Sequence, residues 1–120
     1  MLPDNHFSRK IRLLSPSDYK FVFDKPVRSS DKLLTILARR NNRRQARLGL
    51  AIAKKSVRTA VQRNRIKRII REYFRLHQQK ISSADYVVLV RQGIDKMDNV
   101  TIEHSVAKQF NYLRKKLSNQ

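Results

Sequence analysis

Residues 53–75 read AKKSVRTAVQRNRIKRIIREYFR, and this stretch combines dense positive charge with the apolar periodicity of a helix. It contains nine lysines and arginines against a single acid, Glu72. Thr59, followed three residues later by Gln62, is typical of a capping box, so we expect a helix over residues 60–77. Apolar and aromatic side chains recur at helical spacing and form its expected buried stripe: Ile66, Ile69, Ile70, Tyr73 and His77. His77 is therefore interpreted as a packed histidine rather than as a metal ligand.

The cations of this predicted helix gather on the side that faces away from the apolar stripe. On a helical wheel of about 100° per residue, that side holds Asn64, Lys67, Arg68, Arg71 and Arg75. Arg63 and Arg65 flank the stripe, and Lys54, Lys55 and Arg58 precede the helix start. A solvated face normally mixes both signs of charge, whereas arginine side chains of one sign suit phosphate groups. The pattern favours a helix that packs on one side and binds an anion on the other.

The whole chain shares this positive charge. Its 120 residues include 28 lysines and arginines against 9 acids, which gives a formal net charge of +19. Such self-repulsion favours a polyanionic partner, with nucleic acid first and an anionic membrane surface second. The chain has no cysteine, which excludes disulfides and thiolate zinc sites, and its apolar runs are far shorter than the roughly 20 residues of a membrane span. We expect a cytoplasmic protein with one domain over residues 1–120, in which residues 1–14 are irregular and basic.

The remaining sequence predicts an α/β or α+β two-layer sandwich. Ser15 and Asp18 fit a capping box with proline at the first helical position. Gly49, inside a predicted strand, indicates a bulge or a close backbone approach. Strands 32–39 and 47–53, joined by a polar turn, are expected to form a hairpin. The other expected elements are a helix over residues 16–23, an edge strand over 27–30, a buried strand over 85–91 and a final helix over 101–117.

The residues that could carry chemistry are few. The nine acids show no spacing typical of a nuclease metal site, and His6, His77 and His104 are isolated. We therefore expect no metal site and no catalytic residue on the polypeptide. Tyr19 and Phe23 lie one helical turn apart, near the strand face that carries Leu33, Thr35 and Leu37. From the residues alone, these two aromatics suit either core packing or the stacking of unpaired bases.

One stretch is specific enough to suggest a family. Lys54-Lys55 after a glycine-containing strand, followed by AVQRNRIKRIIRE at residues 60–72, resembles the RNR signature of the bacterial ribonuclease P protein subunit. The resemblance extends to Asp18–Phe23, Arg47–Leu50 and Asp85–Val88. It implies an α-β-β-β-α-β-α fold with a central mixed sheet. It also implies that the basic helix lies in a left-handed crossover between parallel strands, against the usual right-handed preference.

The same resemblance implies an RNA-binding subunit of a ribonucleoprotein enzyme. In that family the partner is a catalytic RNA that uses Mg²⁺ to remove the 5′ leader of precursor tRNA, and the polypeptide alone is not catalytic. By position, the residues implied to bind the catalytic RNA are Arg58, Arg63, Asn64, Arg65, Lys67, Arg68 and Arg71. Those implied to line a cleft for the leader are Tyr19, Phe23, Thr35, Leu37, Lys54 and Lys55. The first of these is often phenylalanine in the family, whereas here it is a tyrosine.

The resemblance also bears on the other possible partners. It implies no cofactor on the polypeptide, Mg²⁺ only in the holoenzyme, no membrane and no obligate protein partner. Two alternatives remain open on the sequence. A small structural RNA-binding protein of the ribosomal type would share the charge but would lack a leader cleft. A cationic membrane-surface protein would use the same charge, but the apolar stripe of its helix would have to be free of the sheet.

Overall fold

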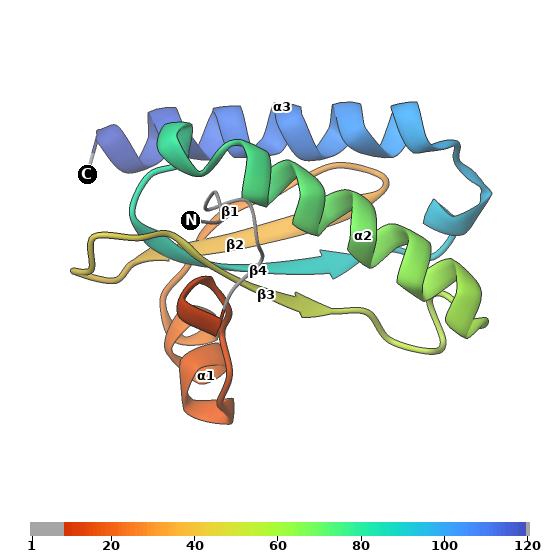
Figure 1. The fold of residues 1–120 in the computed structure, drawn as a ribbon, viewed down its shortest axis with the longest axis horizontal. Helices are drawn as coiled ribbons and strands as arrows, with labels where there is room; N and C mark the ends of the chain where they lie inside the picture. Colours follow the sequence, from red (N-terminus) through yellow and green to blue (C-terminus); the bar gives the residue numbers. More distant parts are fainter. Residues whose placement is uncertain (1–8, 120) are drawn as a thin grey trace, which may run out of the picture.

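The structure, a computed structural model, describes residues 9–119 (Figure 1). Its helices and strands follow the order α-β-β-β-α-β-α, as the resemblance implies. They are α1 (Pro16–Asp24), β1 (Val27–Ser30), β2 (Leu34–Arg40), β3 (Arg47–Ala51), α2 (Ala60–Leu76), β4 (Ala84–Val90) and α3 (Asn99–Ser118). Three short 3₁₀ turns are η1 (Arg9–Ile11), η2 (Gln78–Lys80) and η3 (Ile94–Lys96).

The four strands form one mixed sheet in the order β1-β2-β4-β3. The predicted hairpin of β2 with β3 is wrong, because β4 lies between them. β4 pairs antiparallel with β2 and parallel with β3, so that Val87 lies opposite both Leu37 and Gly49. Every residue of β4 except Leu89 is buried, and a strand that is apolar on both faces is stable only in the centre of a sheet. The helix α2 therefore connects two parallel neighbours, β3 and β4.

Local hydrogen bonds account for the ends of the elements. In α1, Ser15 and Asp18 form the predicted capping box. β2 begins at Leu34 rather than at Lys32, because the Asp31 carboxylate accepts the backbone N–H groups of Leu33 and Leu34 and so holds this segment in a turn. Of the segment expected to be irregular, residues 1–8 lie outside the described part. Residues 9–14 include η1, and the Leu13 N–H donates to the Leu48 carbonyl of β3 at 3.0 Å.

At the start of α2, only half of the predicted capping box forms. Thr59 Oγ1 accepts the backbone N–H of Gln62 at 3.2 Å, as expected of an N-cap residue. The Gln62 side chain does not return to Thr59 but accepts a hydrogen bond from Arg65 Nε at 2.8 Å. The first turn of α2 is therefore joined to Arg65, one of the cations of the RNR segment.

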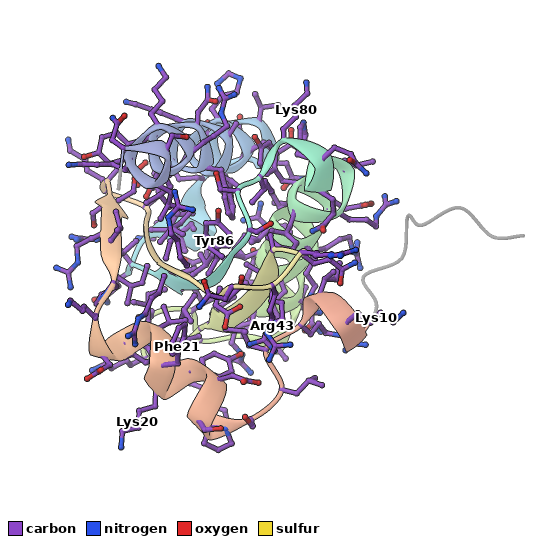
Figure 2. All side chains as sticks on the ribbon, turned by 90° about the vertical axis from the view of Figure 1, so that its left-hand side faces the viewer. Lys10, Lys20, Phe21, Arg43, Lys80 and Tyr86 are labelled. Carbon is purple, nitrogen blue, oxygen red and sulfur yellow. The ribbon has the colours of Figure 1, made fainter. Side chains whose placement is uncertain are left out.

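The two faces of the sheet carry separate apolar clusters. On one face, Leu34 and Ile36 of β2 and Val88 of β4 pack under α2 and α3, and Figure 2 shows Tyr86 inside this layer. On the other face, Leu37 and Val87 pack against Val22 of α1. The predicted alternation of β2, with Leu34 and Ile36 on one face and Leu37 on the other, is confirmed. The predicted place of Leu33 on the Leu37 face is wrong, because Leu33 precedes β2 and packs with the Leu34 and Ile36 cluster.

The buried stripe of α2 differs from the prediction at its C-terminal end. Ile66, Ile69 and Ile70 are buried as expected, but the buried aromatic is Phe74 rather than Tyr73. Phe74 continues the four-residue spacing from Ile66 and Ile70, and its ring lies among those of Tyr86 and Phe110. Tyr73 and His77 are half-buried and stack on each other with ring centroids 4.0 Å apart. This stacking agrees with the interpretation of His77 as a packed residue.

Candidate RNA-binding surfaces

The outer face of α2 carries the cations predicted to bind the catalytic RNA. Asn64 and Arg68 are exposed on it, and Lys67 and Arg71 are half-buried beside them. Arg75 pairs with Glu72 in the last turns of the helix, which partly offsets its charge. The positive face of α2 is therefore centred on Arg68. We define Asn64, Lys67, Arg68 and Arg71 as the α2 face.

Arg63 has a structural role in addition to its charge. Its Nη1 donates to the carbonyl oxygens of Val57 and Arg58, at 2.9 and 3.0 Å. These bonds fold the segment before the helix back onto the first turn of α2. They fix the backbone at Arg58, whose side chain is exposed beside the helix N-terminus. Arg58 and Arg63 therefore lie together, as expected, and these bonds use two of the five N–H donors of Arg63.

Arg65 is held even more firmly by the protein itself. Its Nη1 donates to Asn99 Oδ1 at 2.6 Å, and its Nη2 donates to the carbonyl oxygens of Asp95 and Met97, both at 3.1 Å. With the bond from Nε to Gln62, four of the five guanidinium N–H donors have partners. Arg65 thus joins α2 to η3 and to the start of α3. Sequence reasoning placed it among the RNA-binding cations and had no signal for these contacts, which span about thirty residues of chain.

The second predicted surface lies between α1 and the sheet. Phe23 is 47% exposed, whereas Tyr19 is half-buried against the cluster of Val22, Leu37 and Val87. The Tyr19 ring lies directly over Gly49 of β3, where an added Cβ would meet Tyr19 Cζ at 2.7 Å. Of the two sequence interpretations of Gly49, the close approach is therefore the one observed. Tyr19 packs on the sheet, and Phe23 remains open to a ligand.

The sheet residues of the predicted cleft differ in accessibility. Leu37 is only 3% exposed and lies beneath α1, so it supports the cleft from within. Thr35 is half-buried, and so are Leu89 and Ala51, which continue the same row across β4 and β3. We define Thr35, Leu89 and Ala51 as the open strip, and we call the surface that it makes with Tyr19 and Phe23 the α1 cleft, after the leader cleft predicted from the sequence. Leu89 and Ala51 were not predicted to line the cleft, because the sequence did not indicate that β4 lies between β2 and β3.

Lys54 and Lys55 follow the end of β3, three and four residues beyond Ala51. Both are exposed in a turn closed by the N–H groups of Ser56 and Val57, which donate to the Ala53 carbonyl. This turn connects β3, which contributes to the open strip, to the start of α2. Lys54 and Lys55 lie along the chain between the two predicted surfaces, and their place in the leader cleft stays a prediction.

A buried ion pair anchors the other end of α1. Asp85 of β4 is 1% exposed, and its carboxylate accepts two hydrogen bonds from Arg47, at 2.9 and 2.7 Å, and one from Asn41 at 2.7 Å. Hydrogen bonding to Asp85 raises the pKa of Arg47, which stays charged. Arg47 also lies 3.5 Å from the carboxylate of Asp18 in the first turn of α1. The network holds α1, and with it the aromatics of the α1 cleft, at a fixed position on the sheet.

Neither a metal-ligand cluster nor a membrane-spanning helix is found among the described residues. No group of three or more histidine, cysteine or acidic side chains within residues 9–119 is arranged to hold a metal ion. No helix in the same part of the chain is long and apolar enough to span a membrane.

Comparison with known proteins shows the family to which the chain belongs. The sequence model of the family described as Ribonuclease P matches residues 7–114. The chain belongs to the ribonuclease P protein family. The ribonuclease P protein component of Pasteurella multocida is 50% identical to it over 103 residues, which are 86% of this chain and 87% of that protein. The protein component from Proteus mirabilis strain HI4320 is 49% identical over 102 residues, 85% and 86% of the two chains.

Solved ribonuclease P proteins share the fold. The Staphylococcus aureus RNase P protein superimposes with a TM-score of 0.79 at 28% identity and covers 86% of this chain and 94% of its own. The Thermotoga maritima protein gives a TM-score of 0.72 at 26% identity, with 88% and 96% covered. The α-β-β-β-α-β-α order with a mixed sheet is thus the fold of the ribonuclease P proteins, as the resemblance implied.

Proposed function

We propose that this chain is the RNA-binding subunit of a ribonuclease P, in which the α2 face binds the catalytic RNA and the α1 cleft binds the 5′ leader of precursor tRNA. The observation that carries the proposal is the combination of family membership with a one-signed cationic face on α2 and exposed aromatic surface under α1, on the other face of the sheet. On this proposal the protein acts in the cytoplasm, as part of a ribonucleoprotein that removes the leader.

The α2 face suits the backbone of a folded RNA. Phosphate contacts from arginine and lysine supply affinity that does not depend on sequence. Arg68 is exposed and hydrogen-bonds to no other described residue, so its fork is free to hold a phosphate by two bonds. Arg63 and Arg65 hold the helix against its neighbours through the bonds described above. The cations of the α2 face are thereby preorganised, which lowers the entropy lost when the RNA binds.

The α1 cleft suits an unpaired strand. Proteins bind single strands by stacking bases on aromatic rings and by following the phosphates with basic side chains. Phe23 and Tyr19 offer rings on α1, the open strip offers an apolar floor, and Lys54 and Lys55 offer charges beyond the end of β3. Phe23, at 47% exposed, is more accessible than Tyr19 and the open strip, which are half-buried.

We assign the hydrolysis to the RNA subunit and its Mg²⁺ ions, and the binding of substrate to the polypeptide. The described residues do not fit a metal site of their own, because no three potential metal ligands lie together. The chain's own contribution is then to neutralise phosphate charge near the reacting bond and to hold the leader. Both effects raise the affinity for precursor tRNA.

Reconstitution tests the proposal. The protein alone is expected to leave precursor tRNA uncleaved, and the RNA subunit alone is expected to be slow at low Mg²⁺. Adding the protein at that Mg²⁺ concentration should restore removal of the leader. Cleavage that does not respond to the protein would overturn the proposal.

Leader binding separates this function from that of a structural RNA-binding protein. In complex with the RNA subunit, precursor tRNA should bind more tightly than mature tRNA, and Phe23→Ala should reduce that difference by roughly 1–3 kcal/mol for a lost stack. Leu76→Ala is the matched control, because Leu76 is 62% exposed on α2, outside the α1 cleft. Equal binding of the two tRNAs by the wild-type complex would favour the structural alternative.

A further inference from the structure

The helix α1 is too short to keep its position on the sheet without further contacts. It has nine residues, of which only Val22 is buried, and its last turn contains no basic side chain. Isolated helices of this length are marginal in water, and the carbonyl groups of a last turn have no partner within the helix. A group from another element is therefore needed at the C-terminal end of α1. Phe23, the exposed aromatic of the α1 cleft, lies in this end.

Arg39 of β2 supplies that group. Its Nη1 donates to the Phe21 carbonyl at 2.8 Å, and its guanidinium carbon lies over the Phe21 ring, 4.0 Å from the ring centroid. The same Nη1 lies 3.8 Å from the Asp24 carboxylate. A cation at the C-terminus of a helix also interacts favourably with the helix dipole. One side chain thus contacts residues on either side of Phe23 in the chain.

Arg39 belongs to a row of charged residues that contacts both ends of α1. In the register of the sheet, Asp85 of β4 lies opposite both Arg39 on β2 and Arg47 on β3. Arg47 binds Asp85 and lies 3.5 Å from Asp18 in the first turn of α1. The N-terminal end of α1 is therefore held by Arg47 and the C-terminal end by Arg39.

The surroundings of Arg39 suit a residue that acts through Phe23 and not on a ligand. The Arg39 side chain is 30% exposed, and its guanidinium group is engaged by Phe21 and Asp24. Phe23 is 47% exposed and can stack on a base only while its ring keeps its place beside the open strip. A ring that is held before binding also loses less entropy when the base arrives.

We propose that Arg39 is a positioning residue for the 5′ leader, because it holds the last turn of α1 so that Phe23 meets an incoming base. The inference rests on the proposed function and adds to it a residue that does not contact the leader. The sequence gave no signal for this role, since Arg39 stands at the end of a predicted strand and its partner Phe21 lies 18 residues away in the chain.

Arg40 provides a matched control. Neighbouring residues of a strand point to opposite faces of the sheet, and Arg40 Nη2 donates to the Leu117 carbonyl near the end of α3. Arg39→Ala and Arg40→Ala each remove one arginine and its bond to a helix carbonyl, but only Arg39→Ala releases α1. Urea unfolding of both variants measures the loss of stability that they have in common.

Binding of precursor and mature tRNA to the holoenzyme, reconstituted from the full chain and the RNA subunit, tests the proposal. Arg39→Ala should weaken the binding of precursor tRNA by at least about 5-fold, as for a lost stack, and should leave mature tRNA unchanged. Arg40→Ala should change neither affinity. If Arg39→Ala does not fold, Arg39→Lys takes its place, because lysine keeps the charge at the end of α1 and loses the planar contact with Phe21.

Two further measurements separate positioning from direct contact with the leader. In a chain that already carries Phe23→Ala, the substitution of Arg39 should weaken the binding of precursor tRNA by less than about 2-fold, because residues that act through one contact are not additive. The salt slope of precursor binding should not change, because no phosphate contact is lost.

Equal losses for Arg39→Ala and Arg40→Ala would overturn the inference, since a general loss of stability would then explain both. A loss of about 5-fold that persists without Phe23, or a salt slope that falls by about one unit, would also overturn it, because Arg39 would then contact the leader itself. In these cases the wild-type complex would still prefer precursor tRNA, and the proposed function would stand. A wild-type complex without that preference would overturn both.

Discussion

Arg65 and Arg68 lie on neighbouring turns of α2, and their guanidinium groups have different surroundings. Arg65 is half-buried and bonded to Gln62, Asn99 and two carbonyl oxygens before α3, whereas Arg68 is exposed. Arg65→Ala should therefore lower the free energy of unfolding by about 1–2 kcal/mol, since hydrogen bonds from a charged donor are lost at a partly exposed site. Arg68→Ala should leave stability within about 0.5 kcal/mol, as is usual for a surface substitution.

In RNA binding the order should be reversed, and the substitution of Arg68 should have the larger effect on the salt dependence. For Arg68→Ala, the slope of log affinity against log salt should fall by about one unit, because one phosphate contact is lost. Arg65→Lys is the control: it keeps the charge and loses the fork, so it should reproduce the instability of Arg65→Ala with an unchanged slope. Urea unfolding and salt titrations with the RNA subunit measure both quantities. An unchanged slope for Arg68→Ala would remove this residue from the interface.

At the scale of the element, the first turn of α1 determines how the α1 cleft responds to acid. Asp18 caps this turn by accepting the N–H groups of Leu14 and Ser15, and it lies near Arg47. Burial raises the pKa of Asp18, but these hydrogen bonds and the charge of Arg47 outweigh it, so the pKa lies below its ordinary value of 3.8. A carboxylate with a lowered pKa stabilises the fold above pH 3.8, and this contribution is lost as the pH falls through the lower value in the folded state.

Asp18→Asn should therefore be less stable than the wild type at pH 6, and the difference should shrink as the pH falls below 3.8. Asparagine keeps an acceptor oxygen for the cap, so the variant tests the effect of the negative charge alone. The free energy of unfolding in urea, measured at pH 6 and at several points below pH 4, checks this. A difference between the two proteins that stays constant down to the lowest pH would show that Asp18 does not titrate in this way.

The helices, strands and strand pairings could be predicted from the sequence only in part. The helices and the edge strand were predicted because their caps, proline and apolar spacing are local signals. The partner of β2 was not predicted, because a polar turn between two strands favours a hairpin unless a later strand competes for the same edge. Here β4 does so, as its seven residues are apolar enough to be covered on both sides. The α1 cleft was foreseen only in part for the same reason, since Leu89 comes from that inserted strand.

The whole molecule carries a charge that its own structure does not neutralise. Several of the described acids are used in local contacts: Asp85 and Asp18 lie beside Arg47, Glu72 pairs with Arg75, and Asp31 accepts hydrogen bonds from neutral groups. Most of the lysines and arginines in the described part of the chain are exposed, and the net charge of +19 opposes compaction. On this basis, an anion that binds the folded chain should stabilise it in addition to screening its charge.

Sulfate at millimolar concentration should therefore raise the thermal midpoint of the free protein more than sodium chloride at the same ionic strength. Binding to the folded state alone stabilises it by RT ln(1 + [L]/Kd), about 2.7 kcal/mol when sulfate reaches a hundred times its Kd, which corresponds to several degrees in a chain of this size. Circular dichroism followed against temperature measures the effect. The shift should grow with the logarithm of sulfate concentration and should be smaller in Arg68→Ala, whose fork can hold a sulfate as it would a phosphate. Equal midpoints in the two salts would mean that general screening accounts for the whole effect and that the α2 face has no anion site in the free protein.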